Sequence, residues 1–247
     1  MALAGIPLTG AFAAQINYKY GGVQLGASTY SFRTLRAPDG DGITPVIQAL
    51  TDCNVGIIEL FSPTIEPAFS TFHPPHGTRS AQPTRQEMAA AYRAWANGPE
   101  AKKAREDLRQ WRLSTPIDHF QAVKKRFNDA GVSIFTYTMN YREDFTDEEI
   151  DKTFLQAKGL GVKVIATSTQ QSMVKRLLPV AEKHKIYVAF HGHDQTSNPE
   201  EFAAPESFQK ALSQSKWARS NRDIGHFFAA GVDPVAFIDD HHGQITH

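Results

Sequence analysis

The chain has 247 residues, of which 41% are hydrophobic and 21% charged, an ordinary composition for a globular protein of one large or two small domains. Its 26 basic and 26 acidic residues cancel, so net charge gives no support for general electrostatic binding, and we expect neither a nucleic-acid partner nor stable membrane insertion. The single cysteine, Cys53, excludes an intrachain disulfide and an all-cysteine metal site, and its place at the end of a helical pattern favours a structural thiol.

The N-terminal residues 1–14 are apolar, small and uncharged. They resemble the apolar core and cleavage site of a secretory signal, with Ala11-Phe12-Ala13 as the A-x-A element, although no positive region precedes them. We interpret residues 1–20 as a signal-peptide remnant or a disordered tail. The first alternative predicts a periplasmic or secreted protein, and the second a cytoplasmic one.

The next segment predicts a βαβ unit. Residues 22–32 are typical of a strand that ends in small polar side chains. Residues 43–53 carry apolar side chains at helical spacing, and residues 55–61 form a buried type of strand.

Residues 63–113 interrupt this pattern. A loop rich in Pro, His, Thr and Ser comes first, and a charged, alanine-rich helix over about 84–111 follows. We interpret the segment as an insertion that forms a solvated helical lid over one face. Arg109 and Arg112 could bind an anionic substrate there, but solvated helix charges are the commoner explanation.

Helices and strands alternate through the rest of the chain. Ser114 or Thr115 is expected to cap a helix with Pro116 in its first turn, and residues 146–149 form a capping box. The expected helices cover 116–130, 146–160, 171–184, 205–213 and 234–240, and the expected strands cover 132–138, 162–167, 186–190 and 218–224, with a further strand from 245.

Such alternation with short loops predicts a parallel sheet with helical crossovers. Six strands and the start of a seventh suit either an open doubly wound sheet or a (β/α)8 barrel without its last strands. No glycine-rich phosphate-binding pattern follows the first strand, because Gly21-Gly22 precedes it, and a nucleotide-binding fold is therefore disfavoured.

Polar side chains of the acid–base and metal-ligand types stand at several strand ends, where a barrel carries its active site. His191 and His193 follow one strand, and strand alternation points both to the same side, as a metal site or a proton-transfer pair needs. Alternatively, one of these two histidines packs in the core and the other lies in a loop, without a shared site. Asp223, at the next strand end, is a candidate metal ligand or a helix cap, and His226 lies three residues later.

Glu59 is a carboxylate in an otherwise apolar strand, where burial costs roughly several kcal/mol unless the group is paired or hydrated. We therefore expect it to contact substrate or a basic partner. Tyr30 and Asn140, at other strand ends, are further candidates for substrate binding. His241 and His242 fall near a helix end, where exposure or capping is expected.

Several short motifs, weak alone, are similar in order and spacing to those of one family. They are Leu25–Phe32, Gly56–Leu60, Ala157–Gly161, Val188–His193 and Asp223–Pro234, followed by Ile245-Thr246-His247. Through them the chain resembles the sugar phosphate isomerase/epimerase branch of the xylose isomerase-like TIM barrels. The resemblance implies that residues 21–247 form a (β/α)8 TIM barrel, truncated before its last strands, with the insertion 63–113 after strand two.

The resemblance also implies one divalent metal ion at the barrel mouth, Mn, Mg, Co or Zn, held by two glutamates, an aspartate and a histidine. Asp223 matches the aspartate, but His191 stands at the first glutamate's place, which puts the family's two-glutamate mechanism in doubt. His247 matches the start of a His-x-His strand whose second histidine would fall beyond it. The metal ligands expected here are His191, Asp223, His226 and His247, with His191 or His193 as catalytic base.

These features suggest a metal-dependent isomerase or epimerase that acts on a sugar or keto-sugar through an enediolate. A metal-dependent dehydratase or keto-glycoside lyase on the same substrate class is one alternative, and a non-catalytic secreted carbohydrate-binding barrel is another. Phosphodiester cleavage, as in the related apurinic endonucleases, is disfavoured by the neutral charge. A homo-oligomer is compatible with each of these hypotheses.

Overall fold

A sheet of six parallel strands forms the centre of the molecule. The computed structural model describes residues 16, 19–67 and 84–247. The strands follow one another across the sheet in chain order, and every neighbouring pair is parallel. They are β3 (Ala27–Ser28), β4 (Ile57–Phe61), β5 (Ser133–Thr138), β6 (Val164–Thr167), β7 (Tyr187–His191) and β8 (Ala218–Asn221).

This strand order distinguishes a barrel from a doubly wound sheet. The order of a doubly wound sheet reverses at a switch point, whereas successive strands of a barrel are always neighbours. Beyond β8, Ser220 and Ile245 form a parallel bridge, and the backbone N–H of Thr246 donates to the carbonyl of Ser220 at 2.9 Å. The strand predicted from residue 245 is present only as this isolated bridge, which places Ile245 next to β8.

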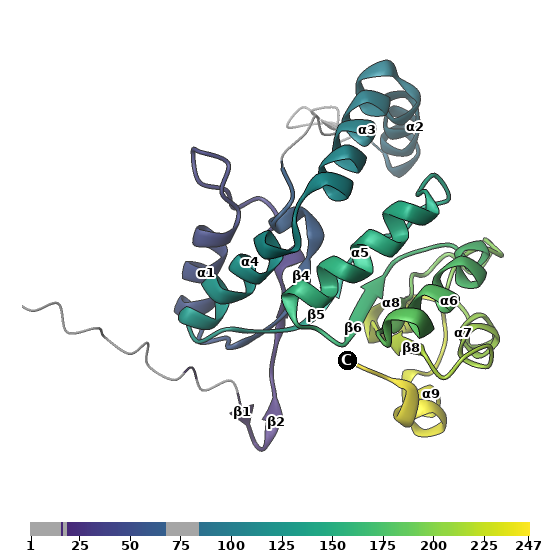
Figure 1. Cartoon of the computed structure of the whole chain (residues 1–247). Helices are drawn as coiled ribbons and strands as arrows, with labels where there is room; N and C mark the ends of the chain where they lie inside the picture. The colour runs from purple at the N-terminus through teal and green to yellow at the C-terminus, as the bar shows by residue number, and fades with distance from the viewer. Residues whose placement is uncertain (1–15, 17–18, 68–83) are drawn as a thin grey trace, which may run out of the picture.

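The helices cover the outer face of the sheet, and Figure 1 shows α4, α5 and α6 following one another beside the strands. The helices are α1 (Ile43–Asp52), α2 (Arg85–Asn97), α3 (Pro99–Ser114), α4 (Ile117–Asp129), α5 (Asp147–Leu160), α6 (Val174–His184), α7 (Pro205–Leu212), α8 (Ile224–Ala229) and α9 (Pro234–His241). Apolar side chains at helical spacing explain this packing, since Phe120, Val123 and Phe127 of α4 are all buried. No helix in the described part of the chain is long and apolar enough to cross a membrane.

The single strand predicted over residues 22–32 is wrong, because the segment is divided. Gly21 and Gly22 both adopt positive φ and turn the chain between β1 (Lys19–Tyr20) and β2 (Val23–Gln24), which pair as a hairpin. The barrel strand β3 has two residues and gives way to a 3₁₀ helix, η1 (Thr29–Phe32). The hydroxyl of Ser28 accepts a hydrogen bond from the backbone of Tyr30 and thereby caps η1.

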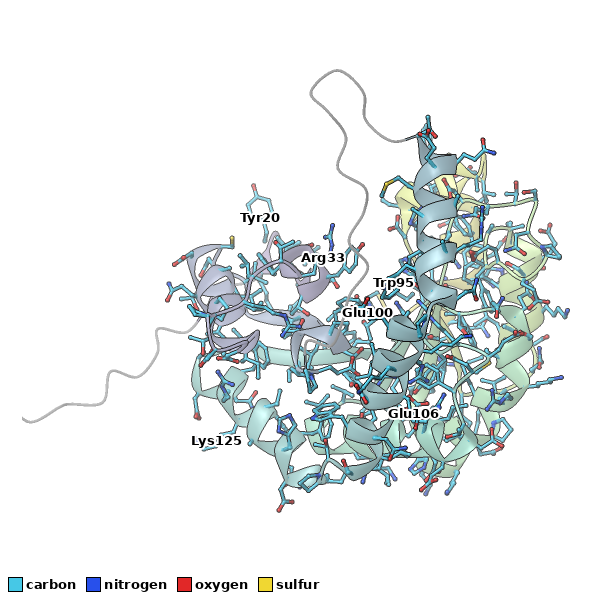
Figure 2. The ribbon with its side chains drawn as sticks, turned by 90° about the horizontal axis from the view of Figure 1, so that it is seen from above. Tyr20, Arg33, Trp95, Glu100, Glu106 and Lys125 are labelled. Atoms are coloured by element: carbon cyan, nitrogen blue, oxygen red, sulfur yellow. The ribbon has the colours of Figure 1, made fainter. Side chains whose placement is uncertain are left out.

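The long helix predicted over 84–111 is also wrong, since α2 and α3 are separate. Proline has no N–H, and it disfavours helical backbone in the residue before it. Gly98 is accordingly extended, with φ −73° and ψ 162°, and Pro99 begins α3. In Figure 2, Trp95 and Glu100 lie on the two sides of this junction. Because α3 runs on to Ser114, that residue caps nothing, and Pro116 stands before α4 without a side-chain cap.

Helix α3 is not a solvated lid, because it packs on α5 through a buried ionic network. The guanidinium of Arg112 donates to Glu66 Oε1 at 2.7 Å and to Glu149 Oε1 at 3.0 Å. Arg105 donates to Glu149 Oε2 at 2.7 Å, and Arg109 reaches the same oxygen at 3.3 Å. These arginines thus pair with carboxylates of the protein. The prediction that Arg109 and Arg112 are solvated or bind an anionic substrate is therefore wrong.

The same network changes the predicted capping box at residues 146–149. The hydroxyl of Thr146 accepts from the backbone N–H of Glu149 at 3.1 Å, so half of the box is present. The Glu149 carboxylate turns to the arginines instead of the backbone. Burial opposes its ionisation, but the bonds from Arg105 and Arg112 hold the pKa of Glu149 below its usual value.

Candidate metal centre

Two neighbouring strands end side by side and carry the candidate site. His191 is the last residue of β7, and its register partner on β8 is Asn221. The buried segment Val188–Phe190 anchors β7, so His191 emerges half-buried at the carboxyl edge of the sheet. Parallel strands place these ends at one edge, which is where barrels carry their sites.

Asp223 connects the end of β8 to α8. Its Oδ1 accepts a hydrogen bond from the backbone N–H of His226 at 3.0 Å, as an N-cap does. Its Oδ2 lies 3.9 Å from His226 Nε2. The capping role considered from the sequence is therefore present, and it leaves the second oxygen available for another partner.

His191, Asp223 and His226 form a group whose ligand atoms all lie within 4.8 Å of one another. Each of the three is half-buried. Two imidazole nitrogens and a carboxylate oxygen suit zinc and other borderline divalent ions, and a three-ligand set leaves a position for water or substrate. The donor set therefore fits the kind of metal ion that the sequence suggested.

His193 completes a cluster of three imidazole rings. Its ring centroid lies 5.4 Å from that of His191 and 5.4 Å from that of His226. The alternation argument placed His191 and His193 on one side, and the structure brings the two rings together. His193 is outside the three-ligand group, and its Nδ1 lies 3.1 Å from Glu201 Oε2.

Glu201 is a residue that sequence reasoning missed. It stands in the loop between β7 and α7, eight positions after His193, and no periodic pattern relates the two. Its carboxylate lies within hydrogen-bonding distance of the histidine and can orient the ring. A carboxylate on one imidazole nitrogen selects the tautomer in which the other nitrogen is a free acceptor.

The electrostatics of the cluster favour a neutral His191. Burial, and then the nearby His193, lower the pKa of His191, while Glu59 and Asp223 act in the opposite direction. A neutral imidazole is the form that binds metal ions. This ring is thus prepared for ligation at neutral pH.

Glu59 occupies the inner face of β4 and has several partners. Its Oε2 lies 2.7 Å from His247 Nε2 and accepts from Asn221 Nδ2 at 2.9 Å, and its Oε1 accepts from Ser28 Oγ at 2.8 Å. Burial opposes ionisation, but His247 and Ser28 lower the pKa of Glu59 to about 2. Glu59 is thus an ionised carboxylate with a basic partner, one of the two contacts expected for it.

The other candidate residues are outside the three-ligand group and have partners of their own. His247 is engaged with Glu59 and with the ring of Phe135, at 5.7 Å between centroids, and is outside the three-ligand group. Tyr30 packs edge-on against Phe61, and Asn140 Oδ1 accepts from the backbone of Ser168 at 2.9 Å. The ligand role of His247 and the substrate-binding roles of Tyr30, Asn140 and Glu59 stay predictions.

Two more histidines belong to the end of α9. The ring of His241 packs on Phe237 at 4.4 Å between centroids, and His242 Nδ1 lies 3.1 Å from the carbonyl of Asp239. His73 and His76 belong to the loop rich in Pro and His, and they lie outside the described residues.

Comparison with known proteins shows the fold. No family model and no curated protein sequence matches the chain. Two solved structures superpose with a TM-score of 0.55 over 90% of this chain and 71% of theirs. One is an uncharacterized protein of Parabacteroides distasonis, at 18% identity, and the other is the probable 3-DHS dehydratase AsbF of Bacillus anthracis, at 15%. A family 2 AP endonuclease of Brucella melitensis superposes at 0.50, with 9% identity, over 90% of this chain and 76% of its own.

The parallel α/β barrel fold expected from the sequence is confirmed by these likenesses. At these identities the likeness shows nothing about the reaction. Because an endonuclease is among the proteins of this fold, the expected absence of a nucleic-acid partner stays a prediction.

Proposed function

We propose that this chain carries the metal-binding part of a sugar isomerase or epimerase that moves a proton beside a carbonyl group. The observation that carries the proposal is the group of His191, Asp223 and His226 at the carboxyl edge of the barrel sheet, with ligand atoms within 4.8 Å. Barrels place catalytic side chains at this edge, and a carboxylate with two histidines suits a divalent ion. Of the expected ions Mn, Mg, Co and Zn, we propose Zn, Co or Mn, because Mg²⁺ prefers oxygen ligands to imidazole.

The bound ion, His193 and Glu59 would have different roles in the proposed reaction. A divalent ion bound there would polarise a carbonyl and its neighbouring hydroxyl and so acidify the carbon-bound proton. His193 is the adjacent base, since Glu201 lies at its Nδ1 and leaves Nε2 to take and return the proton. Glu59 stays ionised near His191, and we propose that it binds a substrate hydroxyl.

Exchange of carbon-bound hydrogen with solvent tests this proposal. The protein with Mn²⁺ is incubated in deuterated water with a panel of keto-sugars, and deuterium incorporation is measured by mass spectrometry. We expect incorporation with at least one sugar, its loss on chelation, and a rate about 10²–10⁴-fold lower for His193→Gln. His242→Gln, at the end of α9, serves as the matched control and keeps the wild-type rate. Exchange with no sugar, or exchange that survives chelation, contradicts the proposal.

A dehydratase or keto-glycoside lyase is the second candidate, because the same proton abstraction can be followed by loss of a group β to the carbonyl. The dehydratase AsbF has this fold, which makes the fold compatible with such a step. Mass spectra of the exchange mixtures separate the candidates. An isomerase or epimerase conserves substrate mass apart from deuterium, whereas a lyase releases water or an alcohol. A barrel that binds carbohydrate without turnover would show neither change.

A further inference from the structure

A polar pocket lies beside the histidine cluster, and of its lining residues only Glu201 has a part in the mechanism above. It has a volume of about 290 Å³, at the lower end of the range of roughly 300–1,000 Å³ for small-molecule sites. Its lining comes from η3 (Gln171–Met173) after β6, from the loop after β7 and from α7. Both loops follow the carboxyl ends of their strands, so the pocket opens at the same end of the barrel as the cluster.

The lining presents hydrogen-bond donors and acceptors together. The uncharged polar side chains are Gln171, Thr196, Asn198 and Ser207, and the charged ones are Glu201, Glu206 and Lys210. Amides and hydroxyls donate and accept, as recognition of a ring with several hydroxyl groups requires. Glu201 and Glu206 oppose the one ammonium group of Lys210, and this balance disfavours a phosphate or another anion.

The wall of the pocket is held in place by the neighbouring loop. The backbone N–H of Gln171 donates to the carbonyl of Glu200 at 2.9 Å, and that of Ser172 donates to the Glu200 carboxylate at 2.8 Å. The backbone N–H of His193 donates to the carbonyl of Phe202 at 3.1 Å. Residues 198–202 are thus tied to η3 on one side and to the histidine cluster on the other, and the pocket is formed before a ligand arrives.

Glu201 belongs to both places. It lines the pocket, and its Oε2 lies 3.1 Å from His193 Nδ1. The His193 ring lies 5.4 Å from the rings of His191 and His226. One side chain therefore separates the pocket from the proposed base, and a ligand in the pocket would be adjacent to a group that reacts at the cluster.

We propose that this pocket is a second subsite, which binds a neutral, hydroxyl-rich unit joined to the keto-sugar that reacts at the histidine cluster. The substrate class is then a keto-disaccharide or keto-glycoside rather than a free keto-monosaccharide. The inference rests on the proposed function, because it names the substrate of the same site. It also predicts that binding energy resides in the part of the substrate that does not react.

Equilibrium binding tests the subsite without turnover. The protein is treated with chelator, and its affinities for lactulose and maltulose are compared with its affinity for fructose, the keto-sugar that both contain. We expect at least one disaccharide to bind tenfold or more tightly than fructose. Ser207→Trp, which fills the pocket, abolishes this preference, and Lys210→Ala reduces it. Ser213→Trp, at the exposed end of the same helix, keeps it.

Equal binding of disaccharides and fructose overturns the subsite, as does absence of binding by any of them or a preference that survives Ser207→Trp. Circular dichroism of each variant confirms that it is folded, and Lys210→Ala provides a surface change that leaves the fold intact if the tryptophan variant does not fold. Deuterium exchange with Mn²⁺ is measured on the same preparations. A disaccharide preference without any exchange refutes the proposed reaction, whereas exchange without the preference refutes the subsite alone.

Discussion

Two clusters of charged and titratable side chains differ in how completely their members are paired. Between α3 and α5, Glu149 is fully buried and accepts from Arg105 and Arg112, which also bonds Glu66. At the barrel mouth, His191, Asp223 and His226 are half-buried, and their ligand atoms face one another without bonding as a closed network.

The difference indicates separate roles. Buried charges persist in a fold when each is paired, and removing one partner leaves an expensive uncompensated charge. Two half-buried imidazoles and a carboxylate, with ligand atoms within 4.8 Å of one another, are stabilised more by a bound cation than by one another. We therefore expect the first cluster to contribute to stability, and the second is the one that we propose for ligand binding.

The largest expected effect is on the paired cluster. Arg112→Met removes the guanidinium between Glu66 and Glu149 and leaves two buried carboxylates without it. We expect the free energy of unfolding in denaturant to fall by about 3–5 kcal/mol. Metal affinity of the folded fraction should stay at the wild-type value. A loss of less than about 1 kcal/mol would mean that the network contributes no more than a surface pair.

Glu59 should make stability depend on pH. Its folded pKa of about 2 lies below the unfolded value of 4.5, so its contribution is present above pH 4.5 and is lost as the pH falls toward 2. The contribution is at most about 3 kcal/mol, since one pKa unit corresponds to about 1.4 kcal/mol. Denaturant curves of wild type and Glu59→Gln should therefore differ most above pH 4.5 and converge near pH 2. Parallel curves over this range would show that Glu59 is not ionised through its partners.

A substitution in the group of His191, Asp223 and His226 should change the affinity for metal and leave the free energy of unfolding nearly unchanged. Asparagine caps a helix about as well as aspartate, so Asp223→Asn should change the free energy of unfolding by less than about 0.5 kcal/mol. Because the substitution removes a charged ligand, the dissociation constant for Mn²⁺ should rise by at least about 100-fold. Loss of a residue that only hydrogen-bonds to a ligand already weakens metal binding by up to about 100-fold, and loss of the ligand itself should cost no less. Calorimetric titration with Mn²⁺ measures the dissociation constants of the wild type and of Asp223→Asn.

Asp233→Asn provides the matched control. Asp233 caps α9 as Asp223 caps α8, accepting from the backbone of Val235 at 2.9 Å, and it is outside the three-ligand group. Its substitution should leave metal affinity unchanged. If Asp223→Asn and Asp233→Asn changed the metal affinity equally, Asp223 would be a helix cap and not a metal ligand.

The smallest effect is expected at an exposed ion pair. Lys125 and Asp129 lie one turn apart on α4 with side chains 75% and 61% exposed, and Figure 2 shows Lys125 at the edge of the molecule. Lys125→Ala should lower the free energy of unfolding by no more than about 0.5 kcal/mol. A cost comparable to that of Arg112→Met would show that burial does not separate the two kinds of ion pair.

The succession of strands along the chain was predictable from the sequence, because alternation of apolar segments is local information. Alternation left the order of the strands in the sheet open between a barrel and a doubly wound sheet. His191, His193 and Asp223 were located by that argument, and the parallel pairing of Ile245 follows from the same pattern. The break at Gly98-Pro99 also had a local cause, which the prediction of one long helix overlooked.

Long-range pairing was not predictable in this way. Arg112 and Glu149 are 37 residues apart, and nothing local to either indicates the other. Glu201 reaches His193 from an irregular loop, where no periodicity relates side-chain directions. The residues that complete the two clusters therefore emerge only once the packing of helices and loops is known.

X-ray absorption of the zinc-loaded protein tests the central assignment most directly. We expect scattering from two imidazoles, with zinc bound to nitrogen and oxygen at about 2.0–2.2 Å, and one imidazole fewer in His226→Gln. A zinc environment without imidazole, or one that neither His191→Gln nor His226→Gln changes, would contradict a metal centre at His191, Asp223 and His226.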